Sequence, residues 1–521
     1  MPGRMSRHAC VTTMLLALVL ASAVRADDAA HVAPPHQAEA KPSVSKADGG
    51  NAHGGPTATA NDHRLPPAST TRHKLALPGR TLAFTATAGA IRIFNDKGEP
   101  QADIATTTYQ LDGADPRSRP VTFLFNGGPG ASSAWLQFGS NGPWRIAMDR
   151  AIANAATPLA LEPNAETWLD FTDLVFIDPL GTGYSRMIAS GDEARKRFFT
   201  VDGDVASIAL VIRRWLEQAD RMQSPKFIAG ESYGGIRGPK IVRNLQTRQG
   251  VAVNGLVLIS PALDFGDVLG TGLSRFVTSL PSMAAIARDN EKRGVLTRAD
   301  MADVEAYARG EFLSDLIKGQ ADAEATRRLA DRFASLTGID QAESRRLAGR
   351  FDVSEFRRAF DRRNGKVTGR YDGSVLGFDP YPDSTNSDFN DPSEEPLLAA
   401  LTSAAFELYA HKLNWRPDGS YELLSRAVNR EWDFGKHRTS VESVSDIREL
   451  LAASPQFKIL VAHGLFDLAT PYFASQIRLD QLPTFGSRDR VRLMVYPGGH
   501  MFYSHDGSRQ ALRDEVRTLM K

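Results

Sequence analysis

Six short runs of nearly uninterrupted apolar residues constrain the fold of this chain most strongly. Such runs are typical of strands that are buried on both faces of a parallel sheet. The runs cover residues 121–125, 174–177, 227–229, 256–259, 458–462 and 491–495. The helical stretches between and after them cover residues 205–218, 239–246, 444–453, 474–481 and 509–520. Strands that alternate with helices predict a three-layer α/β fold with a mostly parallel central sheet.

We expect the first part of this core, residues 71–264, to open with antiparallel strands. Residues 81–87, 90–94 and 103–111 mix apolar and polar side chains in rough alternation, with many β-branched residues. This pattern is typical of strands with one buried face.

The alternation of strands and helices is interrupted from about residue 265 to residue 440. This block has helical periodicity and many charges, as in residues 297–318 and 324–336. We predict that 265–440 is a helical cap inserted over one end of the sheet, and that 441–521 completes the core. A turn-rich loop at 371–392 leaves calcium binding open, but its spacing is not that of an EF-hand and a solvated loop is favoured. Its aspartates are Asp372, Asp379, Asp383, Asp388 and Asp391.

The first 26 residues have the features of an export signal. Arg4 and Arg7 precede an apolar stretch at 11–20, and small residues follow in an A-x-A-like pattern. The stretch is too short to span a bilayer, although an uncleaved anchor is an alternative. Residues 27–70 are rich in Ala, Pro, Gly, Ser and His, which predicts a disordered tether. Its histidines, at irregular spacing, leave metal scavenging open, with a solvated linker favoured. We therefore expect a periplasmic or secreted protein.

Charge and cysteine content exclude several classes of protein. The chain has 62 Lys and Arg against 61 Asp and Glu, a net charge of +1. Nucleic-acid binders usually carry a concentrated basic face, so a nucleic-acid partner is not expected. The single cysteine, Cys10, precedes the apolar stretch of the signal and would be removed with it. A disulfide framework and a thiolate metal site are thereby excluded, and we expect no cofactor and no metal.

The sharpest local signal is the run Gly230-Glu231-Ser232-Tyr233-Gly234, which follows an apolar strand pattern and precedes a helical one. G-x-S-x-G in this context is the nucleophile elbow, a tight turn that exposes a serine hydroxyl. A serine needs a general base, usually histidine, that is oriented by a carboxylate. In this architecture the acid and then the base follow the serine along the chain.

Only five histidines follow Ser232, and one of them comes directly after the last predicted strand. That residue is His500, which makes it the candidate base; His505 is close but precedes the last helix. Asp467 follows the strand at 458–462 and is the candidate acid, with a surface-turn aspartate as the alternative. Oxyanion stabilisation needs converging backbone N–H groups. The run Asn126-Gly127-Gly128-Pro129-Gly130 at the end of a strand can supply them, and it would also serve as a tight structural turn.

Together these residues resemble the serine carboxypeptidases, an α/β-hydrolase-fold family. The resemblance covers most of the chain from about residue 120 and is weakest across the cap. It rests on five blocks in family order. They are Asn126 to Ser133, Asp178 to Ser185, Gly230 to Gly235, Gly464 to Asp467, and Gly499 to Met501.

The resemblance implies a role for each residue. Ser232 would be the nucleophile, His500 the base and Asp467 the orienting acid. Gly128 and Tyr233 would supply the oxyanion N–H groups. Asn126 and Glu231 would hold the C-terminal carboxylate of the substrate, and Met501 would line the pocket for its last side chain. A carboxyl can donate a hydrogen bond to another carboxylate only when protonated, and burial favours that form.

The chain departs from the family in one block, which has the sequence E-x-G-P in many members. Here it reads Ser140-Asn141-Gly142-Pro143, so the second carboxyl of the recognition site is missing. Many relatives also have disulfides, and the antiparallel segment and the tether are not parts of the family core. The sequence looks like a bacterial branch.

We predict an exported serine carboxypeptidase that cleaves the last peptide bond of a peptide through an acyl-enzyme. No membrane association is expected once the signal peptide is removed. One rival is an esterase or acyltransferase with the same triad, because a fold does not fix the substrate. The other is a periplasmic peptide-binding protein with an inactive site.

Overall fold

The computed structural model describes residues 65–154, 159–267, 271–291, 294–384, 390–435 and 441–521. The predicted signal peptide, most of the predicted tether with its histidines His31, His36, His53 and His63, and Cys10 lie outside the described residues. No helix in the described ranges is long and apolar enough to cross a membrane.

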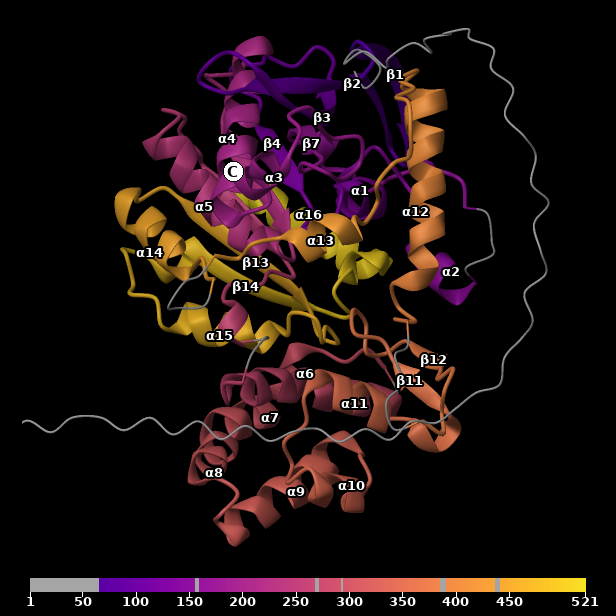
Figure 1. The fold of residues 1–521 in the computed structure, drawn as a ribbon, viewed down its shortest axis with the longest axis vertical. Helices are drawn as coiled ribbons and strands as arrows, with labels where there is room; N and C mark the ends of the chain where they lie inside the picture. The colour runs from indigo at the N-terminus through magenta and orange to yellow at the C-terminus, as the bar shows by residue number, and fades with distance from the viewer. Residues whose placement is uncertain (1–64, 155–158, 268–270, 292–293, 385–389, 436–440) are drawn as a thin grey trace, which may run out of the picture. The chain divides into compact units, whose positions relative to one another are not determined.

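One mixed sheet of ten strands forms the centre of the fold (Figure 1). Its order is β1-β2-β3-β7-β4-β9-β10-β13-β14, with β8 paired to β3. From β7 to β14 all neighbouring strands are parallel. These parallel strands are β7 (Asp173–Ile177), β4 (Val121–Phe125), β9 (Lys226–Glu231), β10 (Gly255–Ile259), β13 (Lys458–Gly464) and β14 (Val491–Tyr496). The six strands predicted from apolar runs are therefore all present, and the predicted parallel core is confirmed.

The antiparallel part of the sheet differs from the prediction in its strand boundaries. It comprises β1 (Ser69–Leu77), β2 (Arg80–Phe94), β3 (Pro100–Leu111) and the short β8 (Arg186–Met187). The two strands predicted at 81–87 and 90–94 are one continuous strand. Gly89, between them, is not a turn residue: a Cβ there would lie 2.7 Å from the Cβ of Ala68, so the glycine permits a close approach of the chain. β1 begins two residues before the predicted core boundary.

Helices cover both faces of the sheet. On one face α4 (Val201–Gln218), α5 (Gly234–Thr247) and α14 (Val444–Ala453) pack into an apolar core. On the other face α12 (Glu395–Glu407) and α16 (Asp506–Leu519) contribute to a second core. Within β7, Leu174 and Phe176 belong to the second core and Val175 and Ile177 to the first. This alternation follows from the period of two in a strand and produces the predicted three layers.

The predicted cap at 265–440 consists of two parts that pack in different places. The helices α6 to α11 build a third apolar core of their own, which also takes in Leu465 and Tyr472 from beyond β13. They are α6 (Ser274–Glu291), α7 (Ala302–Tyr307), α8 (Leu313–Lys318), α9 (Ala323–Thr337), α10 (Gln341–Arg346) and α11 (Val353–Ala359). A hairpin of β11 (Lys366–Thr368) and β12 (Leu376–Phe378) follows them. The chain then returns to the sheet in α12. The part of the block after about residue 395 therefore packs against the sheet and not against the third core.

The remaining elements are short. They are α1 (Ala134–Leu136), η1 (Gln137–Asn141), β5 (Trp144–Arg145), α2 (Met148–Ala153), β6 (Glu162–Pro163), η2 (Trp168–Asp170), α3 (Asp192–Phe198), η3 (Phe265–Asp267), η4 (Arg298–Met301), η5 (Ala308–Phe312), η6 (Arg362–Asn364), η7 (Leu408–Lys412), α13 (Arg426–Glu431), α15 (Tyr472–Asp480), η8 (Arg488–Arg490) and η9 (Phe502–Ser504).

Candidate active site

Ser232 occupies the turn between β9 and α5. Its φ is 62°, in the left-handed region that a residue with a Cβ rarely adopts, so the backbone is strained there. The strain is held by the surrounding structure: the Ser232 amide donates to the carbonyl of Ile259 in β10, and its carbonyl accepts from the amide of Gly235. The serine therefore has the backbone of a nucleophile elbow.

The glycines of this turn are required to different degrees. A Cβ at Gly230 would lie 2.7 Å from the carbonyl oxygen of Gly234, and one at Gly235 would lie 2.4 Å from the Cβ of Pro261. At Gly234 the nearest atom would be 3.6 Å away, an ordinary contact. Crowding thus explains Gly230 and Gly235, whereas Gly234 has room for a side chain.

The glycine-rich run after β4 passes directly beside the nucleophile turn. A Cβ on Gly127 would lie 2.4 Å from the amide nitrogen of Tyr233 and 2.9 Å from the Cβ of Ser232. Within the described residues, the backbone amides of Gly128 and Tyr233 donate to no acceptor. Both residues line the same cavity as Ser232. Two uncommitted N–H donors are therefore available where an oxyanion would form.

His500 and Asp467 form a buried hydrogen-bonded pair at the carboxyl ends of β14 and β13. The distance from His500 Nδ1 to Asp467 Oδ2 is 2.8 Å. Asp467 is fully buried, which is not the surroundings of a surface-turn aspartate. Its Oδ1 accepts from the amides of Ala469 and Thr470. Burial lowers the pKa of His500, but the charge and hydrogen bond of Asp467 outweigh this and leave the pKa above its usual value.

The other histidines after Ser232 have different surroundings. His463 is buried in β13 with Nε2 2.8 Å from Ser475 Oγ, and burial lowers its pKa to about 4. His505 is the residue before α16 and lies 4.0 Å from Asp372. His411 lies in η7, and His437 is outside the described residues. Among the described histidines, His500 is the one paired with Asp467.

Glu231 is buried immediately before the nucleophile. The hydroxyl of Tyr503 donates to both of its carboxyl oxygens, at 2.9 and 3.1 Å, and the side chain of Asn126 is also hydrogen bonded to it. Asn126 is fixed in turn because its Oδ1 accepts from the amide of Leu136. Burial raises the pKa of Glu231 to about 7, although His500, Tyr503 and Asn126 oppose the rise. The carboxyl is therefore partly protonated near neutral pH.

The position of the missing family carboxyl is occupied by neutral groups. Ser140 lies in η1, a π-helical turn that packs against Tyr503. The Ser140 hydroxyl and both amide atoms of Asn141 are buried without a hydrogen-bond partner in the described structure. Tyr503 thus provides Glu231 with a neutral hydroxyl donor.

The cavity beside Ser232 has a volume of about 400 Å³. Residues from both parts of the core and from the inserted block line it. They are Gly128, Pro129, Ser232, Tyr233, Ala262, Phe265, Arg370, Tyr371, Leu424, Ser425, Arg426, Asn429, Phe434, Ala469 and Thr470. Met501, predicted to contact the substrate, is not among them and is buried in the core beside Phe502.

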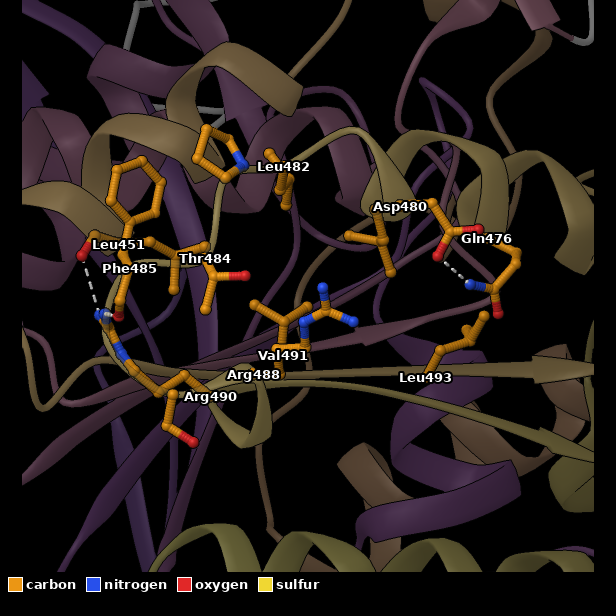
Figure 2. A pocket seen from close by; sticks show the side chains of 13 residues that line it. Leu451, Gln476, Asp480, Leu482, Thr484, Phe485, Arg488, Arg490, Val491 and Leu493 are labelled. Atoms are coloured by element: carbon orange, nitrogen blue, oxygen red, sulfur yellow. Dashed lines mark hydrogen bonds between the residues drawn. The ribbon is translucent and has the colours of Figure 1, made fainter.

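A second cavity of about 320 Å³ lies between α14, α15 and β14 (Figure 2). Its walls combine apolar side chains, such as Leu451 and Phe485, with polar and charged ones, such as Asp480 and Arg488. Figure 2 shows Arg490 hydrogen bonded to backbone oxygens of Leu451 and Phe485. None of the candidate site residues lines this cavity, so we assign the chemistry to the cavity beside Ser232.

The aspartate-rich loop serves a structural purpose. In the described ranges no group of three or more His, Cys, Asp or Glu side chains is arranged to hold a metal ion. Asp372 accepts from the amide and hydroxyl of Ser374, and Asp391 from those of Ser393. These carboxylates stabilise turns. Asp388 lies outside the described residues.

One supporting residue was not predicted from sequence, the fully buried Arg237 in the first turns of α5. Its Nε donates to Asp204 at 2.6 Å, and its Nη1 donates to the carbonyl of Asn126. It thereby connects α4 to the glycine-rich run. The sequence did contain one sign of this role. Arg237 is a single charged residue on the apolar face of the helix that directly follows the nucleophile.

We expect Arg237→Gln to lower the free energy of unfolding by about 3–5 kcal/mol, because it leaves Asp204 buried without its charged partner. Urea unfolding measures this. In the double variant with Asp204→Asn both charges are absent, and part of the loss should be regained. A loss below about 1 kcal/mol in the single variant would contradict this account of the pair.

Comparison with known proteins gives a family match for the middle of the chain. Residues 108–277 match the family model described as serine carboxypeptidase, so this segment carries a domain of that family. The chain is 28% identical to serine carboxypeptidase-like 20 of Arabidopsis thaliana over 166 residues, which are 31% of the chain and 30% of the relative. It is 32% identical to the pheromone-processing carboxypeptidase KEX1 of Yarrowia lipolytica over 142 residues, 27% of the chain and 21% of the relative. The matched part spans about a third or less of the length of these relatives.

A likeness in structure extends over more of the chain. The crystal structure of KEX1ΔP, a prohormone-processing carboxypeptidase from Saccharomyces cerevisiae, superposes with a TM-score of 0.54 at 15% identity. The match covers 86% of this chain and 95% of that one. At this identity the comparison shows the fold, and it confirms the predicted α/β-hydrolase architecture.

Proposed function

We propose that the protein is an exported serine carboxypeptidase of a bacterial branch of the family, which releases the C-terminal residue of peptides through an acyl-enzyme. The observation that carries the proposal is Glu231, a buried carboxyl that directly precedes Ser232 and is hydrogen bonded to Asn126. An esterase would gain nothing from a protonated carboxyl at this position. A peptidase that acts at a free C-terminus can use such a donor to hold the substrate carboxylate.

The first half of the proposed reaction forms the acyl-enzyme. Ser232 Oγ attacks the carbonyl carbon of the last peptide bond while His500 Nε2 accepts the hydroxyl proton. The charge on the tetrahedral oxygen is stabilised by the free amides of Gly128 and Tyr233. His500 then gives its proton to the departing nitrogen, the C–N bond breaks, and the C-terminal amino acid leaves.

The second half returns the enzyme to its initial state. A water molecule attacks the ester of Ser232, and His500 accepts its proton as the new carbon–oxygen bond forms. The same proton passes to Ser232 Oγ when the ester bond breaks. Asp467 stays ionised throughout, keeps the Nδ1 proton of His500 directed toward itself, and stabilises the imidazolium.

Export is supported by the sequence pattern of residues 1–26, a basic start, a short apolar stretch and small residues. A mature chain without cysteine suits an oxidising compartment, because no thiol can mispair. Cell fractionation followed by N-terminal sequencing tests this part. We expect the protein outside the cytoplasm, cleaved after Ala23 or Ala26. Protein with an intact N-terminus that stays in the cytoplasm would contradict the prediction.

The substrate class is tested with three compounds that share one acyl part, an N-blocked dipeptide, its C-terminal amide and its ethyl ester. The proposal predicts efficient release from the free acid and a kcat/KM at least about tenfold lower for the amide, which lacks the carboxylate. Rapid cleavage of the ester with no release from the free acid would identify an esterase instead.

The pH dependence of KM provides a separate prediction. Because Glu231 has a pKa of about 7, its donor form is present below that pH and is lost above it. We expect KM for the free-acid peptide to rise about tenfold per pH unit above about 7, and KM for the ester to stay level. In Glu231→Gln the side chain donates without titrating, so the rise should disappear. The same rise in the glutamine variant would show that another group is responsible.

A further inference from the structure

The cavity beside Ser232 contains two arginines for which the proposed chemistry has no use. Arg370 follows β11 and Arg426 begins α13, and both line the cavity together with Ser232. Apart from a contact of Arg370 with the ring of Tyr371, neither guanidinium has a side-chain partner among the described residues. Two positively charged side chains, both exposed to solvent, therefore line the same cavity as the candidate nucleophile.

Several other arginines of the inserted block are paired with carboxylates. Arg288, Arg298 and Arg328 each make two hydrogen bonds to one carboxylate. Such forked contacts are the usual way in which a guanidinium is satisfied. Arg370 and Arg426 have no such carboxylate partner among the described residues, as is also true of the exposed Arg416 and Arg430, and their donors are open to solvent or to a ligand.

One carboxyl lies near both arginines. Glu394 is within electrostatic range of Arg370, Arg426 and His500, but its carboxyl group accepts no hydrogen bond from any described residue. Burial, followed by the charge of Asp391, raises the pKa of Glu394 to about 7. Near neutral pH it is therefore only partly ionised and offsets less than one of the two positive charges. Arg370 and Arg426 are the charged residues in the cavity lining, and no carboxylate lines it.

On the proposed function, the cavity fits the acyl side of the bond to be cleaved. Glu231 and Asn126, which would hold the C-terminal carboxylate, do not line it, and neither does Met501. Its walls include the packed rings of Tyr233, Phe265 and Phe434. The residue that precedes the cleaved bond would therefore place its side chain in this cavity.

We propose that Arg370 and Arg426 select substrates with an acidic residue, aspartate or glutamate, immediately before the bond that is cleaved. This inference rests on the proposed function for the identity of the bond, but not for the acyl preference itself. A carboxylate in the cavity can accept charge-assisted hydrogen bonds from both guanidinium groups. The amide isosteres have the same shape without the charge, and a lysine side chain would be repelled.

Matched substrates separate charge from size. The full chain is assayed with N-blocked dipeptides that carry glutamate, glutamine or lysine before a constant last residue, and with N-blocked ethyl esters of the same three residues. We expect kcat/KM to be at least about tenfold higher for glutamate than for glutamine in both series, and lowest for lysine. The ester series has no C-terminal carboxylate, so it reports on the acyl side alone.

Variants identify the source of the preference. Arg370→Gln and Arg426→Gln are each expected to reduce the ratio of glutamate to glutamine, and the double variant should bring it close to 1. The exposed Arg430, four residues further along α13 and outside the cavity lining, serves as the matched control. Arg430→Gln should keep the ratio of the unchanged enzyme.

Each outcome bears on a different claim. Equal rates for the glutamate and glutamine esters, or a preference that persists in the double variant, would overturn the inference. Hydrolysis of esters with a clear glutamate preference, without release from any peptide, would uphold the arginine site and refute the carboxypeptidase. If neither series is hydrolysed, both claims fail.

Discussion

Replacing Ser232 by alanine is expected to lower kcat for release of a C-terminal residue by about 10⁴-fold or more, without unfolding the protein. The alanine removes the only atom of this residue that can attack the carbonyl. It keeps the Cβ and thus leaves the packing of the nucleophile turn unchanged. The amides of Gly128 and Tyr233 stay in place, so weak residual catalysis by the remaining site is expected.

Steady-state kinetics with an N-blocked dipeptide measure this loss, and thermal unfolding checks the fold. Ser207→Ala is the matched control, because Ser207 is also buried and its hydroxyl donates to a backbone carbonyl within α4. It should keep close to full activity. Activity retained in Ser232→Ala with the melting temperature unchanged would remove Ser232 from the mechanism.

Replacing Asp467 by asparagine is expected to lower kcat by about 10⁴-fold, through the tautomer of His500. In the structure Asp467 Oδ1 accepts from two backbone amides, and its Oδ2 faces His500 Nδ1. An asparagine would satisfy the amides with its carbonyl oxygen and turn its NH₂ group toward the imidazole. His500 Nδ1 must then accept, so Nε2 carries the proton and can no longer take one from Ser232.

The readout is kcat for peptide and ester alike, since both need the same base. KM for the peptide should change little, because Glu231 and Asn126 are unaltered. An asparagine variant with near-normal kcat, or a loss confined to KM, would show that Asp467 does not orient the base.

The parallel core could be predicted from sequence because its strands are short, apolar and separated by helices. A strand buried on both faces leaves this pattern within a few residues, as Leu174 to Ile177 illustrate. The nucleophile turn could be predicted for a similar reason, since Gly230 and Ser232 lie within three residues of one another on the chain. Asp467 and His500 could be proposed as acid and base because each follows a predicted strand, and parallel strands bring their carboxyl ends to one edge of the sheet.

Features that depend on contacts between distant segments could not be read in this way. The hydroxyl of Tyr503 reaches Glu231 across 272 positions of sequence, and Arg370 enters the cavity from the inserted block. Gly89 lies between the two predicted strands, and a glycine that permits a close approach cannot be told from a turn glycine by sequence alone. The return of α12 to the main core was likewise hidden, since its helical pattern does not say which surface it covers.

The measurement that tests the central claim most directly is mass spectrometry of a six-residue peptide with a free C-terminus during incubation with the enzyme. The account predicts loss of one residue at a time from the C-terminus, no loss from the C-terminal amide, and no change with Ser232→Ala. Cleavage inside the peptide, removal of residues from the N-terminus, or equal shortening of the amide would contradict it.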